Sequence, residues 1–353
     1  MKLRRILSVL LVLILVVALA SCGNQNENQT TTQTTTSPFT QPEKTGVTVE
    51  GKSVFNNIDY TIYIPASYNS NEKTPLVMAL HGGLQGTGAI DQPRTVFADF
   101  IGLNKYADEH GFITVYPRQS MTNHFYGVDY WNWYSQQERA DAEPKALYDI
   151  ICEIKDEYNV DESNVFVCGF SAGAAMAEIM AVTYPDVFAG CASVAGVSYK
   201  ACGAVDSVTV QTQGPTKTYE ELAQEITTGM GDKAQLKKLL VINGTEDVMV
   251  NPVNSLAAAN AWTIAMKGID ANVDTQIKTE NATDKNDVTY TKSVYATLNG
   301  EEICTHYQIN DMGHLWPGAN VGVSLDPFYG MDFAFDGGID ASKLICQFFG
   351  LDK

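Results

Sequence analysis

Hydrophobic and polar positions along the chain alternate between the period of a strand and the period of a helix. Residues 47–51 and 59–66 alternate apolar and polar, as half-buried antiparallel strands do. Continuous apolar runs over 75–83, 112–117 and 164–170 are typical of strands buried on both faces. The first strands therefore predict an antiparallel N-terminal edge beside a buried sheet.

Later segments continue the alternation. Further strands are predicted over 188–196, 237–244 and 302–309, and helices over 95–111, 142–159, 172–185, 253–268 and 341–350. Repeated strand–helix alternation indicates the α/β class, with a mostly parallel central sheet and helices on both faces. Residues 201–235 break this pattern with Thr, Gly and Gln and one short predicted helix over 218–226, so they are a candidate lid insertion.

The N-terminus has the composition of an export signal. Lys2, Arg4 and Arg5 precede an apolar run over 6–20, which is shorter than the roughly 20 residues that span a bilayer. Leu19-Ala20-Ser21-Cys22 resembles the lipobox of bacterial lipoproteins. This resemblance implies cleavage before Cys22 and lipidation of its thiol; an ordinary signal peptide with a chance cysteine is the alternative.

These features divide the chain into three parts. Residues 1–21 are the expected lipoprotein signal peptide, and the Thr/Gln-rich stretch 22–46 has too few apolar residues to fold, so it is the expected disordered tether. Residues 47–353 are then one domain, anchored outside the cytoplasm to the cell membrane through Cys22. We expect this domain to be a monomer.

The net charge and the cysteine positions limit which partners and metal ligands the chain can have. A net charge of −18 disfavours nucleic acid, whose phosphates the chain would repel. Without Cys22, six cysteines remain, which allow 15 pairings among which the sequence does not choose. No pair has zinc-finger spacing, so we expect no structural metal. The six are Cys152, Cys168, Cys191, Cys202, Cys304 and Cys346.

The motif Gly169-Phe170-Ser171-Ala172-Gly173 lies between a predicted strand and a predicted helix. In this G-x-S-x-G context a serine occupies a tight turn with its hydroxyl exposed above the sheet. The N–H of Ala172, at the start of the helix, favours developing negative charge. Ser171 is therefore the candidate nucleophile, and Ala172 is the first candidate donor of an oxyanion hole.

A serine nucleophile needs a base and an orienting acid. Of five histidines, His314 lies in a Gly/Pro-flanked loop after the last predicted strand and is the candidate base; His110, His124 and His306 are expected to be solvated or structural. Asp247 follows a buried strand and completes the chain order Ser, Asp, His. Glu246 and Asp311 are alternative acids.

The second oxyanion donor is expected in the Gly-rich loop over 80–86. Its glycines allow backbone N–H groups to face a ligand, so Gly83 or Leu84 is the candidate. His81 in the same loop is expected to brace it. No metal or organic cofactor is needed for this chemistry.

Together, GFSAGAAM, LHGG, VYP, YWNWY, NGTED and GHLWPG resemble the polyhydroxybutyrate depolymerase-like esterases. This α/β-hydrolase family includes feruloyl and acetylxylan esterases, and the likeness runs from about residue 50 to the C-terminus. The resemblance implies that Ser171, Asp247 and His314 are nucleophile, acid and base. It also implies substrate-binding roles for aromatic residues of the shared motifs, namely Tyr116, Trp131, Trp133 and Trp316.

Two positions depart from the family. Gly83 and Tyr130 stand where members often carry cysteine, so neither the disulfide pattern nor the polymer specificity can be carried over. The expected function is a cell-surface serine carboxylesterase that acts through an acyl-enzyme. Its substrates would be feruloyl or acetyl esters of plant polysaccharide, or hydroxyalkanoate oligomers and polymer. A non-catalytic solute-binding lipoprotein and a serine peptidase are the alternatives.

Overall fold

A computed structural model describes residues 37–56, 58–83, 96–119, 130–323, 333–335 and 337–353. The expected signal peptide, Cys22, Leu84 and His124 lie outside the described residues. Within those residues, no helix has the length and apolar character needed to cross a membrane.

The described residues form a ten-stranded sheet of order β1-β2-β4-β3-β5-β6-β7-β10-β9-β8. The strands from β4 to β10 in this order run parallel. The predicted antiparallel N-terminal edge is confirmed by β1 and β2, and β9 and β8 add a second antiparallel edge that the sequence did not predict. The strands are β1 Val47–Lys52, β2 Asp59–Ile64, β3 Thr74–Leu80, β4 Ile113–Arg118, β5 Val160–Phe170, β6 Gly190–Val194, β7 Lys238–Gly244, β8 Lys278–Thr283, β9 Thr289–Ala296 and β10 Glu302–Ile309.

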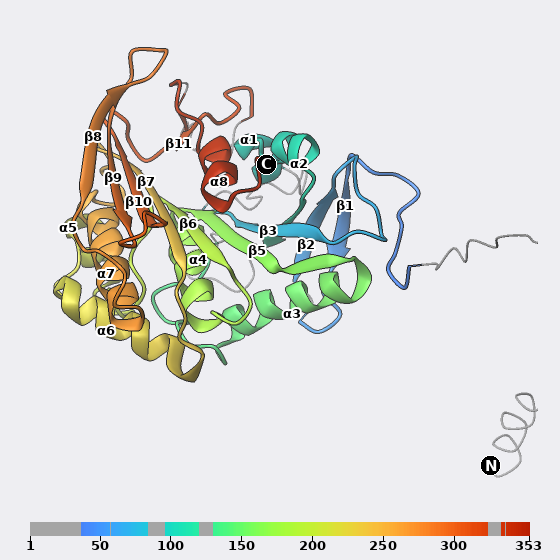
Figure 1. The fold of residues 1–353 in the computed structure, drawn as a ribbon, viewed down its shortest axis with the longest axis horizontal. Coiled ribbons are helices and arrows are strands. Elements are labelled where there is room, and N and C mark those ends of the chain that lie inside the picture. The colour runs from blue at the N-terminus through green and yellow to red at the C-terminus, as the bar shows by residue number, and fades with distance from the viewer. Residues whose placement is uncertain (1–36, 57, 84–95, 120–129, 324–332, 336) are drawn as a thin grey trace, which may run out of the picture. The chain divides into compact units, whose positions relative to one another are not determined.

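Helices cover both faces of the sheet, as predicted (Figure 1). One face carries α1 Val96–Ile101, α2 Leu103–His110 and α8 Ala341–Phe349; the other carries α3 Ala142–Glu157, α4 Ala172–Thr183, α6 Tyr219–Met230 and α7 Val253–Ile269. The single helix predicted over 95–111 is two helices, because Gly102 adopts a left-handed φ of 66° between them.

Alternation along the central strands builds two cores. Leu76 and Met78 of β3 pack with the α3, α4, α6 and α7 layer, whereas Val77 and Ala79 pack with the α1, α2 and α8 layer. Because successive side chains of a strand point to opposite faces, a strand with apolar residues at every position is stable only between two such layers.

The folded domain begins earlier than the expected boundary at residue 47. Ser37 Oγ donates to Ser70 O at 2.6 Å, Ser70 N donates to Gln41 Oε1 at 2.7 Å, and Thr40 N donates to Glu157 O at 2.8 Å. Residues 37–46 are therefore part of the domain and not of the tether. Their polar composition concealed this, since they attach by hydrogen bonds and not by an apolar face.

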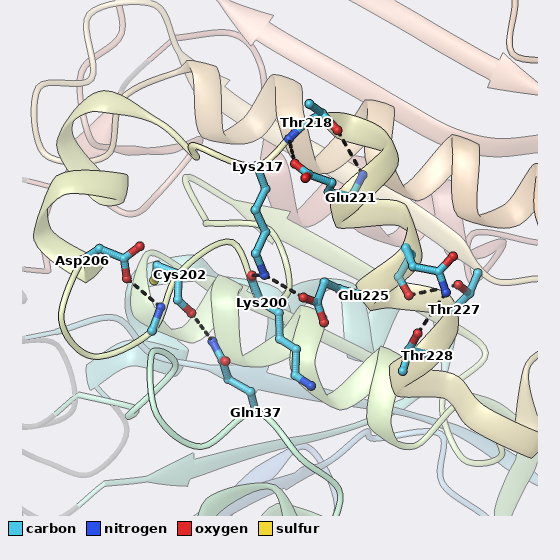
Figure 2. Close-up of polar contacts among 12 residues, drawn as sticks. Gln137, Lys200, Cys202, Asp206, Lys217, Thr218, Glu221, Glu225, Thr227 and Thr228 are labelled. Carbon is cyan, nitrogen blue, oxygen red and sulfur yellow. Dashed lines mark hydrogen bonds and ion pairs between the residues drawn. The ribbon is translucent and has the colours of Figure 1, made fainter.

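The segment 201–235 contains α5 Ser207–Gln213 and α6, which packs along α7. Thr218 and Glu221 form a capping box at the start of α6. Figure 2 shows how the segment is attached: the Lys217 ammonium donates to Lys200 O at 2.8 Å and contacts Glu225 at 2.7 Å, and the Gln137 amide donates to Cys202 O at 3.1 Å. The bonds to Lys200 and Gln137 tie the residues that flank α5, Lys217 and Cys202, to parts of the chain outside 201–235.

The registers bring the ends of five parallel strands, β3, β5, β6, β7 and β10, to one edge. Leu80 pairs with Gly169, Phe170 with Val194, Val194 with Ile242, and Gly244 with Ile309. The loops that follow β3, β5, β7 and β10 therefore leave the sheet side by side. In open α/β sheets, this carboxyl edge is where ligands bind.

Candidate active site

Ser171 lies on a strained turn between β5 and α4. Its φ of 56° and ψ of −120° are values that residues with a Cβ rarely adopt. The turn is fixed by Ser171 N, which donates to Val194 O at 2.9 Å, and by Ser171 O, which accepts from Ala174 N at 3.0 Å. This geometry lifts the side chain out of the regular helix and presents it to the edge of the sheet.

The glycines of the motif are required by close backbone approach. A Cβ on Gly169 would lie 2.2 Å from Gly173 O, and a Cβ on Gly173 would lie 2.2 Å from Leu80 O. The first contact closes the turn, and the second seats the start of α4 against the end of β3. The G-x-S-x-G pattern therefore fixes Ser171 relative to the loop that carries Gly83.

His314 and Asp247 form a buried pair. His314 Nδ1–H donates to Asp247 Oδ2 at 2.7 Å, and the exposed fractions of the two residues are 7% and 4%. Asp247 Oδ1 accepts from Met249 N at 2.9 Å and from Val250 N at 2.8 Å, which orients the carboxylate. A proton held on Nδ1 leaves Nε2 as the basic atom of the ring.

The alternative acids lie elsewhere. Glu246 and Asp311 are exposed, and the His314 imidazole is bonded to Asp247. The imidazole also stacks on Phe170, with ring centroids 5.0 Å apart. The ring therefore has a bonded edge and a packed face, both of which limit its rotation.

Ser171 and His314 line the same cavity, with a volume of about 510 Å³. Ala172 and Gly83, two of the three oxyanion candidates, line it as well. Four aromatic side chains contribute to the wall, and none of the described lining residues is Lys, Arg, Asp or Glu. The full lining is Gly83, Tyr130, Trp133, Tyr134, Ser171, Ala172, Ala175, Val197, Ala204, Ser207, Val208, Gln211, Met249, Val250, His314 and Phe333.

Of the four predicted substrate-binding aromatics, only Trp133 lines the cavity. Trp131 and Trp316 are fully buried, and Tyr116 donates its hydroxyl to Asn104 Oδ1 at 2.6 Å inside the core. Trp316 packs edge-on against Phe170, under the histidine ring. The rings of these three residues are buried in the core and do not line the cavity.

Part of the cavity wall was not predicted from the sequence. Val197 comes from the loop after β6, Phe333 from the C-terminal region, and Val208 from α5. A single apolar residue in an irregular loop has no period that distinguishes wall from core. The carboxyl-edge position of the β6 loop was the available signal for Val197.

The remaining described histidines have structural contacts. His81 Nδ1–H donates to Gly82 O at 2.8 Å and Nε2 accepts from Gln119 N at 3.1 Å, so this ring is neutral and braces its loop. His306 in β10 contacts Asn243 Oδ1 at 2.6 Å, and burial lowers its pKa to about 4. His110 stacks on Tyr106 at the end of α2.

The described residues contain neither a disulfide bond nor a cluster of side chains suited to a metal ion. The six cysteines there are free thiols, and all but Cys152 are buried. No group of three His, Cys, Asp or Glu side chains in the described part of the chain is placed to hold a metal ion.

Residues 58–254 match the family model described as esterase PHB depolymerase. The chain is 29% identical to poly(3-hydroxyalkanoate) depolymerase C of Paucimonas lemoignei, over 84% of this chain and 67% of the relative. It is 27% identical to feruloyl esterase B of Thermothelomyces thermophilus, over 58% of this chain and 69% of the relative. The chain thus spans about two thirds of the length of these relatives.

A solved structure shares the fold. Acetyl xylan esterase from Aspergillus awamori superposes with a TM-score of 0.63 at 20% identity, covering 86% of this chain and 99% of that one. At this identity the likeness concerns the α/β-hydrolase architecture alone. Because the family model covers more than half of the chain, the chain belongs to the esterase PHB depolymerase family and is a carboxylic ester hydrolase.

Proposed function

We propose that the chain is a serine carboxylesterase with Ser171 as nucleophile, His314 as base and Asp247 as orienting acid. The observation that supports this most is the His314–Asp247 hydrogen bond of 2.7 Å beside a cavity that both His314 and Ser171 line. The strained backbone of Ser171 is a second support, since such strain persists where function requires it.

The proposed reaction has two halves. His314 Nε2 takes the proton of the Ser171 hydroxyl as its oxygen attacks the ester carbonyl, and the same proton then passes to the leaving alcohol. Water, activated by His314, next cleaves the acyl-enzyme and releases the acid. Asp247 holds the imidazole in the required tautomer and stabilises the imidazolium formed in each half.

The oxyanion of each tetrahedral intermediate needs N–H donors. We assign one to Ala172, whose amide belongs to the first turn of α4, where N–H groups have no acceptor within the helix. The second donor comes from the loop after β3, at Gly83 or Leu84. Gly83 borders the cavity, whereas Leu84 lies outside the described residues.

The cavity wall favours a bulky, uncharged ester. A volume of about 510 Å³ is typical of sites for drug-sized ligands. Val208 at the rim is 72% exposed although it is apolar, so the apolar wall continues onto the surface. Hydroxyalkanoate oligomers fit this description, as do feruloyl esters; the depolymerase relative covers more of the chain, and we place hydroxyalkanoate first.

A fluorophosphonate probe tests the proposal directly. The wild-type protein should label at one serine and hydrolyse 4-nitrophenyl esters, and Ser171→Ala should lose both. Ser163→Ala, an exposed serine near the opposite end of β5, is the matched control and should keep both. Labelling or turnover that survives in Ser171→Ala would exclude Ser171 as nucleophile.

Substrate choice is tested by comparing three esters with the same protein. Hydroxybutyrate trimer should be hydrolysed with a higher kcat/KM than acetylated xylan, because an acetyl group leaves most of the cavity empty. Methyl ferulate separates an aromatic from an aliphatic preference. A higher kcat/KM on acetylated xylan would contradict the argument from the cavity.

We also propose that the enzyme is held at the cell surface by a lipid on Cys22, which the lipobox-like sequence supports. Cys22→Ser should then move the esterase from the membrane fraction to the medium and abolish palmitate labelling. Retention of both in the variant would contradict lipidation at this cysteine.

A further inference from the structure

Glu143 is a buried carboxylate with no part in the proposed reaction. It lies in the first turn of α3 and is 6% exposed. Its Oε2 accepts from Asn132 N at 2.7 Å, and its Oε1 accepts from Asn132 Nδ2 at 2.6 Å and from the Gln119 side-chain amide. Three N–H donors on one carboxyl group are an arrangement suited to the ionised form, because a carboxylate only accepts.

The first partner connects Glu143 to the aromatic wall of the cavity. Asn132 lies between the buried Trp131 and Trp133, which lines the cavity. Its Oδ1 accepts from Tyr134 OH at 3.3 Å, and Tyr134 OH is 2.9 Å from Tyr130 OH. Three of the four aromatic side chains in the wall therefore lie within two residues of the backbone that Glu143 holds.

The second partner connects Glu143 to the loop after β3. Gln119 follows β4, and its backbone N–H donates to His81 Nε2 at 3.1 Å. His81 in turn donates to Gly82 O at 2.8 Å, and Gly83 borders the cavity. One carboxylate thus joins two segments, 81–83 and 130–134, that reach the cavity from different strands and face Ser171.

We propose that Glu143, as a carboxylate, is a positioning residue that holds the aromatic wall and the 81–83 loop in the geometry that binds the ester. This inference rests on the proposed function of the Ser171 site. Since Glu143 touches the walls and not the reacting atoms, its loss should act mainly on KM for substrates that fill the cavity.

The ionisation of Glu143 gives the proposal a readout that a merely structural role would not give. Burial raises the pKa of Glu143 to about 7, while the bonds from Asn132 oppose that rise. The titratable groups of the elements around it are His81, held neutral through Gln119, and Tyr134; on α3 itself, Lys145 is paired with Asp149. Below pH 7, protonation of Glu143 leaves its carboxyl group with fewer acceptor sites for the N–H donors of Asn132 and Gln119, and the aromatic wall of the cavity loosens.

The experiment compares Glu143→Gln with the wild type on two esters that share a leaving group. These are 4-nitrophenyl acetate and 4-nitrophenyl hexanoate, assayed for kcat and KM between pH 5.5 and 8.5. Protonation of His314 affects both esters alike, so it cancels in the ratio of their kcat/KM values. The matched control is Glu153→Gln, a carboxylate of the same helix that accepts from Ser53 Oγ and Val54 N, away from the cavity.

At pH 8, Glu143→Gln should raise KM for the hexanoate about tenfold, as expected for the loss of one charge-assisted hydrogen bond. The KM for the acetate and the kcat values for both esters should change far less. The hexanoate-to-acetate ratio of the wild type should fall as pH drops through 7, and the ratio of the variant should be low and independent of pH. Glu153→Gln should behave as the wild type.

Two results would overturn the inference. One is a folded Glu143→Gln enzyme with wild-type KM for the hexanoate; the other is a wild-type selectivity ratio that stays constant between pH 5.5 and 8.5. The second measurement needs no variant, so it decides the matter even if Glu143→Gln does not fold. Either result leaves the proposed function intact, because that function is tested separately by the loss of activity in Ser171→Ala.

Discussion

The strained turn at Ser171 predicts an unusual effect on stability. The φ of 56° and ψ of −120° lie in a region that favours glycine, so a side chain here costs about 1–3 kcal/mol. Ser171→Ala removes the hydroxyl and keeps the Cβ, whereas Ser171→Gly removes both. Neither variant has a nucleophile, so their difference in stability reports the strain at this Cβ together with the entropy that glycine adds to the unfolded chain.

The expected magnitude follows from two opposing contributions. Glycine relieves the strain of about 1–3 kcal/mol but raises the entropy of the unfolded chain, which costs about 0.5–1 kcal/mol. Ser171→Gly should therefore be more stable than Ser171→Ala by about 1 kcal/mol, or ~1–2 °C in Tm for a domain of this size. At an unstrained helical position the same exchange has the opposite sign.

The assay is thermal unfolding of both variants, followed by circular dichroism in the same buffer with reductant. The matched control for glycine itself is Ala257→Gly in the middle of α7, which should lower Tm. If Ser171→Gly unfolds at a lower temperature than Ser171→Ala, the turn does not store strain, and the backbone geometry of Ser171 no longer supports its role as nucleophile.

Three further predictions follow from single contacts. Asp247→Asn should lower kcat on 4-nitrophenyl acetate by roughly 10³–10⁴-fold with little loss of Tm, because the amide favours the wrong imidazole tautomer; an unchanged kcat would exclude Asp247 as the acid. Val208→Asp, at the exposed rim of α5, should raise KM for 4-nitrophenyl hexanoate ~5-fold, about 1 kcal/mol, and spare the acetate; equal effects on both esters would remove α5 from the binding wall. Burial raises the pKa of Glu178 in α4 to about 8. Between about pH 4.5 and pH 8 the folded state therefore keeps a proton that the unfolded state has lost, so the free energy of unfolding falls as pH rises through this range. Glu178→Gln should flatten this fall and stabilise the protein at pH 8 by roughly 1–3 kcal/mol in urea unfolding, and a variant with the wild-type pH slope would show that Glu178 is not its source.

The sequence predicted the elements whose own residues form an apolar face or an apolar run. The predicted strand over 302–309 coincides with β10, and the inner side of the predicted helix over 142–159, which includes Ala146 and Ile150, is buried in α3. A continuous apolar run predicts a strand that is buried on both faces, because a strand between two helical layers buries every one of its side chains. The structure confirms the predicted, mostly parallel sheet and its antiparallel first edge.

Polar elements carried no such signal. Strand β8 is almost entirely exposed and β9 is mostly half-buried, and polar residues (Thr, Lys, Ser, Asn and Glu) hold most of their positions, so their pairing depends on backbone bonds and on β10 as a template. Helix α5 is similarly exposed and holds one buried residue, Val210. Elements held by their neighbours and not by their own apolar face cannot be found by periodicity.

At the site, residue types predicted the chemical roles of side chains better than they predicted where those side chains lie. A serine between glycines and a late loop histidine have few structural uses, and the structure brings both to one cavity. An aromatic ring has many uses, and Trp131 and Trp316 are buried under the cavity and not in its wall. Glu143 was missed because a glutamate in a first helical turn is ordinary at the surface, and only the fold shows that this one is covered.

The proposed acid and base lie on two loops that hydrogen bonds join. Thr245 N donates to Ile309 O and Glu246 N to Met312 O, both at 2.9 Å, which binds the loops after β7 and β10 together. The walls of the cavity come from separate segments, among them 130–134 and α5. Exchange of wall segments should therefore change which ester is bound without disturbing the hydrogen bonds that join the loops of Asp247 and His314.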